Sequence, residues 1–172
     1  MNNHFELFGL RAAFALDADA LDRAYRGVQE RVHPDRHASG GDADRRASMQ
    51  WTMRANEAYR TLKDPMERAR YLLELNGVDV AFETNTAMPA DFLVRQMELR
   101  EELEAAAAAK DAAALDALRA GIRADARAIE GTLAELLDLR HDYAAAGALV
   151  RKLKFLRRLD EEVDALFDAI EA

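Results

Sequence analysis

The chain has 172 residues, half of them hydrophobic and a third charged, as in a soluble, helix-rich protein of one or two small domains. Its 24 Lys and Arg against 32 Asp and Glu give a net charge of −8, which argues against nucleic acid as the main partner. Without cysteine, signal peptide or apolar run near the roughly 20 residues that span a membrane, we expect a cytoplasmic protein with no disulfide, no cysteine-ligated metal and no membrane contact.

The first third of the chain predicts an antiparallel helical hairpin. A short amphipathic start over residues 5–10 precedes Asp17, a candidate N-cap, and Pro34 ends the helix that follows because the residue before proline disfavours helical backbone. Asp42 is a candidate N-cap for the second helix. Apolar residues recur at helical spacing in both helices, which predicts that their faces pack together: Leu21, Tyr25, Val28 and Val32 in the first; Trp51, Ala55, Ala58 and Leu62 in the second.

The remainder predicts further helices and a second domain. Asp64-Pro65-Met66-Glu67 combines an acidic N-cap, proline at the first helical position and glutamate two residues later, and this helix is expected to stop near Asn76-Gly77. Pro89 opens an alanine- and leucine-rich region divided near 110–111 and 138–142, which predicts a three-helix bundle. We therefore expect an all-α protein with an N-terminal helical hairpin domain over 1–76, a linker over 77–88 and the bundle over 89–172.

A short loop between the hairpin helices carries the first candidate site. It contains His33-Pro34-Asp35, followed by Arg36. One interpretation is a simple helix stop. Another is a metal site formed by His33, Asp35 and His37, although no further His or Cys lies nearby in the sequence to complete it.

The bundle carries the second candidate site. On a helical wheel Phe92, Gln96, Leu99 and Leu103 share one stripe, whereas Leu93 and Met97 lie about a third of a turn away and Val94 nearly opposite. The outer residues are either buried by two neighbouring helices or form an exposed docking surface with charged edges. In the last helix, Phe155 is expected to point away from the apolar stripe as a stray surface aromatic or a binding anchor; that stripe is Leu149, Leu153, Leu156, Val163 and Ile170.

Residues 5–75 resemble the J-domain family in several separated motifs. These are Leu7-Phe8-Gly9-Leu10, the loop tripeptide His33-Pro34-Asp35, Asn56-Glu57-Ala58-Tyr59, Leu62 and Asp64-Pro65. The resemblance implies that His33, Pro34 and Asp35, with the basic residues Arg26 and Arg36, engage a DnaK-class ATPase chaperone. Val32 and Ala55 depart from the larger residues common in the family and suggest thinner packing under the loop.

Over nearly its whole length the chain resembles, more narrowly, the HscB-type J-domain co-chaperones of bacterial iron–sulfur cluster assembly. The matching segments are Phe92–Leu103, Val150–Leu156, Arg68-Ala69 and Tyr71-Leu72-Leu73. The resemblance implies a surface that binds the iron–sulfur scaffold protein IscU, made of Leu93, Val94, Met97, Glu98, Arg100, Glu101 and Phe155. Ala105 replaces an acidic residue of the family, which puts one contact in doubt.

The function implied by this resemblance is that of a co-chaperone and not of an enzyme. It would bind IscU, deliver it to the chaperone HscA, stimulate the HscA ATPase and so promote cluster transfer and protein maturation, while holding no cofactor or cluster itself. A J-domain adaptor for a different client and a small metal-dependent enzyme are the alternatives. The oligomeric state stays open between a monomer and a weak dimer.

Overall fold

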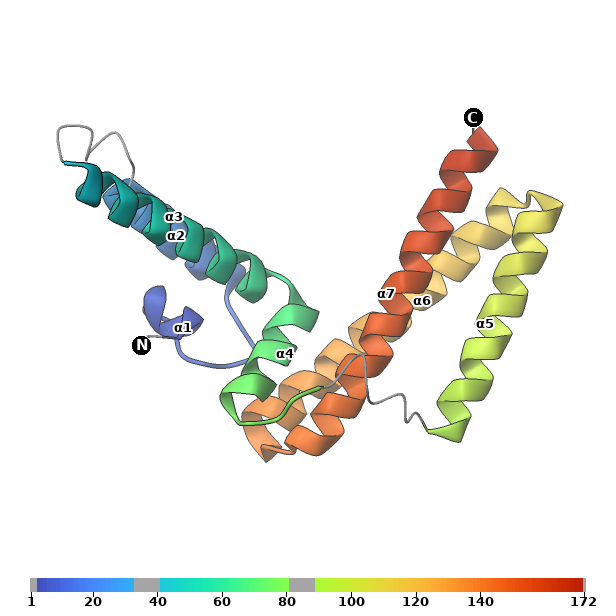
Figure 1. Cartoon of the computed structure of the whole chain (residues 1–172). Coiled ribbons are helices and arrows are strands. Elements are labelled where there is room, and N and C mark those ends of the chain that lie inside the picture. Colours follow the sequence, from blue (N-terminus) through green and yellow to red (C-terminus); the bar gives the residue numbers. More distant parts are fainter. Residues whose placement is uncertain (1–2, 33–40, 81–88, 172) are drawn as a thin grey trace. The chain divides into compact units, whose positions relative to one another are not determined.

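The computed structural model describes residues 3–32, 41–80 and 89–171, and these form helices and connecting turns without any strand, as expected of an all-α protein. The chain folds into two compact units, Met1–Leu72 and Leu73–Ala172 (Figure 1), which are described separately below. No helix in the described ranges is long and apolar enough to cross a membrane.

The first unit is built on a hairpin of α2 (Ala18–Val32) and α3 (Asp42–Lys63), with the short α1 (His4–Leu7) and the first part of α4 (Pro65–Leu75) beside it. The predicted stripes are largely confirmed, since most of their members are buried: Leu21, Val28, Ala55, Ala58 and Leu62. The expectation for Trp51 is wrong, because 46% of this residue is exposed and Ser48, one turn earlier, is buried instead.

Side-chain caps start two of these helices as predicted. The carboxylate of Asp17 accepts hydrogen bonds from the backbone N–H groups of Asp19 and Ala20 at 2.9 and 3.1 Å, and that of Asp64 accepts one from Glu67 at 3.0 Å. The prediction for Asp42 is wrong. Gly41 is the N-cap of α3, and Asp42 is the first helical residue, where its carboxylate faces Arg45 at 2.8 Å and the positive end of the helix dipole.

A ladder of polar and aromatic side chains joins α2 to α3 along one side of the hairpin. The rings of Tyr25 and Tyr59 stack with centroids 4.1 Å apart, and the Tyr25 hydroxyl donates to Asn56 at 2.7 Å. Lys63 and the Tyr59 hydroxyl donate to the Asp22 carboxylate at 2.6 and 3.0 Å. These two hydrogen bonds, with Lys63 first, lower the pKa of Asp22 below its ordinary value of 3.8. The ladder fixes the register of the two helices.

The end of α4 is a glycine-dependent cap that falls where the sequence predicts it. Gly77 has a φ of +75°, and its N–H donates to the carbonyl of Glu74 at 3.0 Å. The next N–H, from Val78, reaches back to the carbonyl of Leu73 at 2.9 Å. This pair of bonds satisfies the last carbonyls of the helix and requires a residue that tolerates the left-handed conformation.

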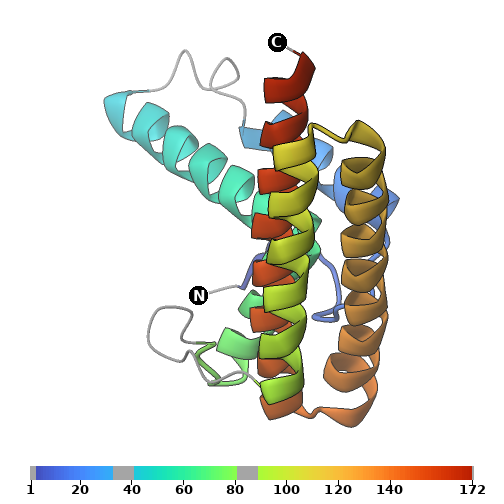
Figure 2. The same ribbon diagram turned by 90° about the vertical axis from the view of Figure 1, so that its right-hand side faces the viewer.

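The second unit contains the predicted three-helix bundle, α5 (Ala90–Ala109), α6 (Ala112–Glu135) and α7 (Tyr143–Glu171), with the π-helical turn η2 (Leu136–Arg140) between the last two. The three helices run alongside one another (Figure 2). The predicted divisions are confirmed. Lys110 and His141 take left-handed backbone, and Asp111 and Asp142 cap the helices that follow.

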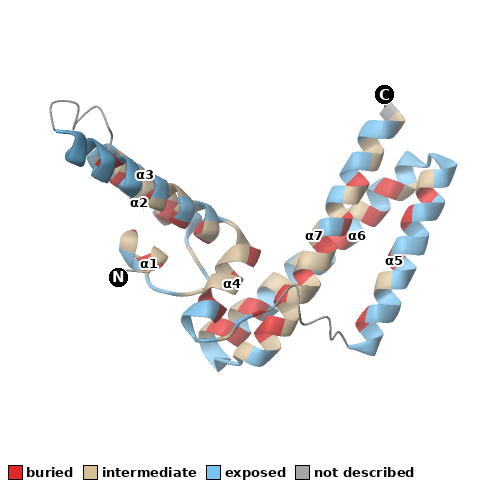
Figure 3. Ribbon diagram, in the orientation of Figure 1, coloured by how far each residue is buried: buried red, intermediate tan, exposed pale blue. Residues whose placement is uncertain are grey.

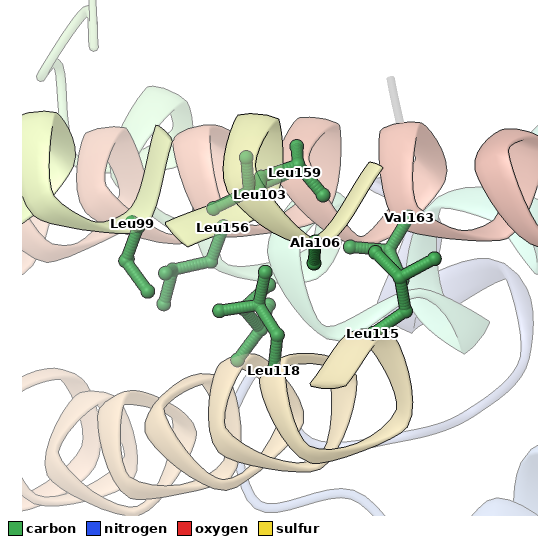
Figure 4. Packing of buried hydrophobic residues seen from close by; sticks show 9 residues of the cluster. Leu99, Leu103, Ala106, Leu115, Leu118, Leu156, Leu159 and Val163 are labelled. Atoms are coloured by element: carbon green, nitrogen blue, oxygen red, sulfur yellow. The ribbon is translucent and has the colours of Figure 1, made fainter. Parts of the chain in front are cut away.

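The core of the bundle is formed by one stripe from each helix (Figure 4). The predicted residues Phe92, Leu99 and Leu103 are buried, and Gln96 is half-buried at the edge. In α7 the buried face is wider than predicted and includes Val150 and Leu159. Members of the central cluster are Leu99, Leu103, Ala106, Leu115, Leu118, Ile122, Leu156, Leu159 and Val163.

Candidate partner-binding surfaces

The outward side of α5 exposes a group of large apolar side chains. Leu93, Val94 and Met97 are 45%, 56% and 64% exposed, whereas Phe92 and Leu99 on the opposite side of the same helix are buried. Figure 3 shows this contrast as pale and red faces of α5. The interpretation in which two neighbouring helices bury both faces is therefore wrong for the described chain.

Charged residues border this apolar group. Glu98 forms an ion pair with Arg95 at 3.3 Å, and Arg95 also lies 3.5 Å from Glu102. Glu101 is exposed and makes no ion pair within the described residues. An apolar centre with a charged rim is the usual composition of a protein-binding patch. We call Leu93, Val94, Met97, Glu98 and Glu101 the α5 face.

Arg100, which was predicted to belong to the same surface, also ties α5 to α7. Its two terminal guanidinium nitrogens donate to the two carboxylate oxygens of Glu162 at 3.0 and 3.1 Å. This bidentate geometry orients both side chains. Glu162 lies 62 residues further along the chain, so sequence reasoning gave no signal for this pair.

Phe155 is half-buried and is not the exposed aromatic that the sequence suggested. Its ring meets that of Phe92 edge-on, with centroids 5.7 Å apart and planes at 84°. The ammonium of Lys152 lies 4.9 Å from the Phe92 ring centroid. Because Phe92 belongs to the first turn of α5, these contacts hold that turn against α7. Arg100 and Phe155 thus form the α7 edge of the α5 face.

A groove of about 570 Å³ runs between α5 and α6, adjoining the α5 face on the side of Arg95. Its floor is made of small and apolar side chains, and Ala105 is one of them. Three of the residues that line the groove are charged, namely Arg95, Glu102 and Asp111. The others are Leu99, Ala105, Ala106, Ala109, Ala114, Ala117, Leu118, Gly121 and Ile122. The sequence analysis did not identify this groove.

The predicted site in the first unit falls largely outside the described residues. His33, Pro34, Asp35 and Arg36 all lie there, and so does His37, so the structure does not test the metal-site alternative. In the described ranges no group of three or more His, Asp or Glu side chains is arranged to hold a metal ion. Arg26, the remaining basic residue of the prediction, is exposed on α2.

Comparison with known proteins gives consistent matches along the chain. A family model described as the HSCB C-terminal oligomerisation domain matches residues 88–164. The Co-chaperone protein HscB homolog of Burkholderia multivorans is 56% identical over 170 residues, covering 99% of this chain and 97% of the relative. The homolog from Burkholderia cenocepacia is 55% identical over the same share.

Solved structures match the whole fold. Chaperone HscB from Vibrio cholerae superposes with a TM-score of 0.86 at 40% identity, covering 98% of this chain and 99% of that one. Human co-chaperone protein HscB gives a TM-score of 0.90 over 96% of this chain and 82% of that one, but at 24% identity this match concerns the fold alone. The helical hairpin unit joined to a three-helix bundle is thus the fold of a J-type co-chaperone. At more than half identity along nearly its full length, the chain belongs to the HscB family of co-chaperones.

Proposed function

We propose that the chain binds the iron–sulfur scaffold protein IscU, delivers it to the DnaK-class chaperone HscA and stimulates the HscA ATPase, which promotes cluster transfer and protein maturation. Membership of the HscB family supplies the general role of a co-chaperone. The observation that carries the more specific proposal is the exposed apolar α5 face, which lies in the segment matched by the HscB family model.

The scaffold-binding half of the proposal rests on the chemistry of the α5 face. Leu93, Val94 and Met97 supply apolar area that would be removed from water on docking. Burial of apolar area contributes roughly 25 cal/mol of favourable binding free energy per Å². Glu98 and Glu101 border this area and would orient a partner with complementary basic groups. We assign this role to the bundle, residues 89–172.

Arg100 and Phe155 have a double role in this proposal. Each already has an intramolecular partner, Glu162 for Arg100 and Phe92 for Phe155, so each first holds α5 in place against α7. Their remaining exposed atoms would complete the scaffold surface at its α7 edge. We therefore expect substitutions at these two positions to lower both stability and scaffold affinity.

The ATPase-stimulating half is assigned to a J-domain over residues 1–76, joined to the bundle by a linker over 77–88. His33, Pro34 and Asp35 would contact the chaperone, where Asp35 accepts a charge-assisted hydrogen bond from a partner arginine and Pro34 stiffens the loop. Arg26 and Arg36 would face an acidic patch on the chaperone. ATP hydrolysis belongs to the chaperone, so we propose that the chain acts in the cytoplasm as an activator without enzymatic activity or cofactor.

The direct test is the single-turnover ATPase rate of HscA, measured with and without IscU, after adding the chain or its His33→Gln variant. We expect strong stimulation that requires His33 and increases with IscU. Stimulation of the same size with and without IscU would retain the J-domain role but favour an adaptor for another client. Absence of stimulation would contradict the proposal.

The scaffold surface needs variants that leave the fold intact. Leu93→Ala and Met97→Ala remove exposed side chains of the α5 face and should weaken IscU binding, measured by isothermal titration, without lowering stability. Leu139→Ala is the matched control, because Leu139 is 76% exposed in η2, outside the proposed surface. Equal affinities for all three variants and the unmodified chain would remove the α5 face from the proposal.

A further inference from the structure

Methionine is the only sulfur-containing residue of the sequence, which has six methionines and no cysteine. Three of the methionines that the structure describes are largely exposed, namely Met49 at 59%, Met53 at 70% and Met97 at 64%. Met66, in contrast, is only 5% exposed. Oxidation at sulfur in this sequence therefore falls on methionine, and the exposed methionines are expected to react before the buried one.

Met97 differs from the two exposed methionines of α3 because it lies in the middle of the α5 face. Leu93 precedes it by one helical turn and Glu101 follows it by one turn, so the three share one side of α5. Leu93 and Val94, the other apolar residues of this face, have saturated hydrocarbon side chains that a mild oxidant does not attack. Met97 is thus the position at which oxidation changes the apolar part of the α5 face.

We propose that Met97 is a reversible oxidation site, and that its conversion to methionine sulfoxide weakens docking of the scaffold protein on the α5 face. In this step a lone pair of the Met97 sulfur attacks one oxygen of hydrogen peroxide, so that an S–O bond forms and the O–O bond breaks. The departing hydroxide takes the proton of the transferred oxygen and leaves as water. The sulfur is oxidised by two electrons, and the peroxide is reduced by two. The effect on docking rests on the proposed function, whereas the oxidation itself does not.

The charges around Met97 favour an uncharged oxidant. Glu98 is paired with Arg95 at 3.3 Å, but Glu101 and Glu104 are exposed acids without an ion pair among the described residues. A surface of this sign repels anionic oxidants such as peroxynitrite. Hydrogen peroxide is neutral at physiological pH and reaches the sulfur without this electrostatic barrier.

Oxidation at Met97 replaces a flexible apolar side chain by a polar one at the centre of the α5 face. The sulfoxide oxygen accepts hydrogen bonds from water, and covering it with an apolar partner surface removes those bonds. We therefore expect the affinity for IscU to fall by about tenfold or more. Because Met97 lies outside the bundle core, its oxidation should leave the chain folded.

The test treats the full chain with millimolar hydrogen peroxide, follows each methionine by peptide mass spectrometry and measures IscU affinity by isothermal titration. We expect Met97 to be oxidised together with Met49 and Met53 and well before Met66, and the affinity to fall as the Met97 sulfoxide accumulates. Treatment with both methionine sulfoxide reductases, MsrA and MsrB, should restore the affinity, because each enzyme reduces one of the two sulfoxide epimers.

Three variants separate Met97 from the other methionines. Met97→Leu keeps an apolar side chain of similar volume, so it should retain nearly the full affinity for IscU and lose its sensitivity to peroxide. Met53→Leu is the matched control, since it removes an equally exposed sulfur outside the α5 face and should stay as sensitive as the unmodified chain. Met97→Gln places a polar oxygen in the α5 face and should show the weak affinity of the oxidised chain without any oxidant.

Two results would overturn the proposal. One is a Met97 that stays reduced while Met49 and Met53 are oxidised, which mass spectrometry detects without any scaffold protein. The other is IscU binding that does not respond to Met97 oxidation, or that remains sensitive to peroxide in Met97→Leu. If the unoxidised chain fails to bind IscU, the proposed function is refuted together with the effect on docking, whereas the mass spectra still decide whether Met97 is an oxidation site.

Discussion

Truncation of a buried side chain of α5 should lower the free energy of unfolding, whereas truncation of an exposed one should leave it nearly unchanged. Leu99 is 1% exposed within the bundle core, so Leu99→Ala removes a fully buried side chain and should cost about 3 kcal/mol of unfolding free energy. For a unit of the size of Leu73–Ala172 that unfolds on its own, each kcal/mol lowers the melting temperature by about 4–8 °C, so the expected fall is roughly 12–24 °C. Met97 is 64% exposed, and Met97→Ala should change stability by no more than about 0.5 kcal/mol.

Urea unfolding followed by far-ultraviolet circular dichroism measures both variants. The single tryptophan, Trp51, belongs to the first unit, so its fluorescence shows whether that unit is affected. We expect the dichroism transition of Leu99→Ala to move to lower urea while the fluorescence transition stays in place. A stability loss above about 1.5 kcal/mol for Met97→Ala, or one below about 0.5 kcal/mol for Leu99→Ala, would refute the assignment of the two faces.

Three further expectations concern local backbone and charge. Gly77→Ala should destabilise by about 1 kcal/mol in thermal unfolding, because alanine is strained at a φ of +75°. Gly27→Ala, inside α2 where an added methyl group would meet open space, should instead stabilise by about 0.5–1 kcal/mol. Stability changes of the same sign for the two variants would contradict the cap at Gly77. Asp22→Asn should be less stable than the unmodified chain at neutral pH, because a pKa below 3.8 in the folded state means that the ionised carboxylate stabilises the fold above that pH. This deficit should shrink as the pH falls below 3.8, and a constant deficit across that range would show that the contact with Lys63 is not the cause.

Local signals in the sequence predicted most helix boundaries. Asp17 and Asp64 cap helices as expected, and the divisions at 110–111 and 138–142 separate the bundle helices. These features depend on residues within one turn of each other, which is why a single sequence reveals them. Asp42 was the exception, since a neighbouring glycine took the cap position.

Features that depend on distant residues were not predictable. The helical wheel places Trp51 on the inner stripe of α3, but it does not tell whether another helix covers that point, and none buries it. For the same reason Phe155 was expected to be exposed, although Phe92, far away in sequence, covers part of its ring. The Arg100–Glu162 pair is a third case.

These long-range contacts hold α5 in the bundle while the α5 face stays exposed. An exposed apolar group on one side of α5 adds nothing to folding, so the opposite side must hold the helix by itself. The buried stripe of Leu99 and Leu103 does so along the middle, and Phe92 does so at the first turn with Phe155 against it. The Arg100–Glu162 pair adds a directional link that limits rotation of α5 about its own axis. A substitution at Arg100 or Phe155 therefore changes the orientation of α5 and of all its exposed apolar side chains. A substitution at Met97 removes one of those side chains and leaves the orientation of the helix unchanged.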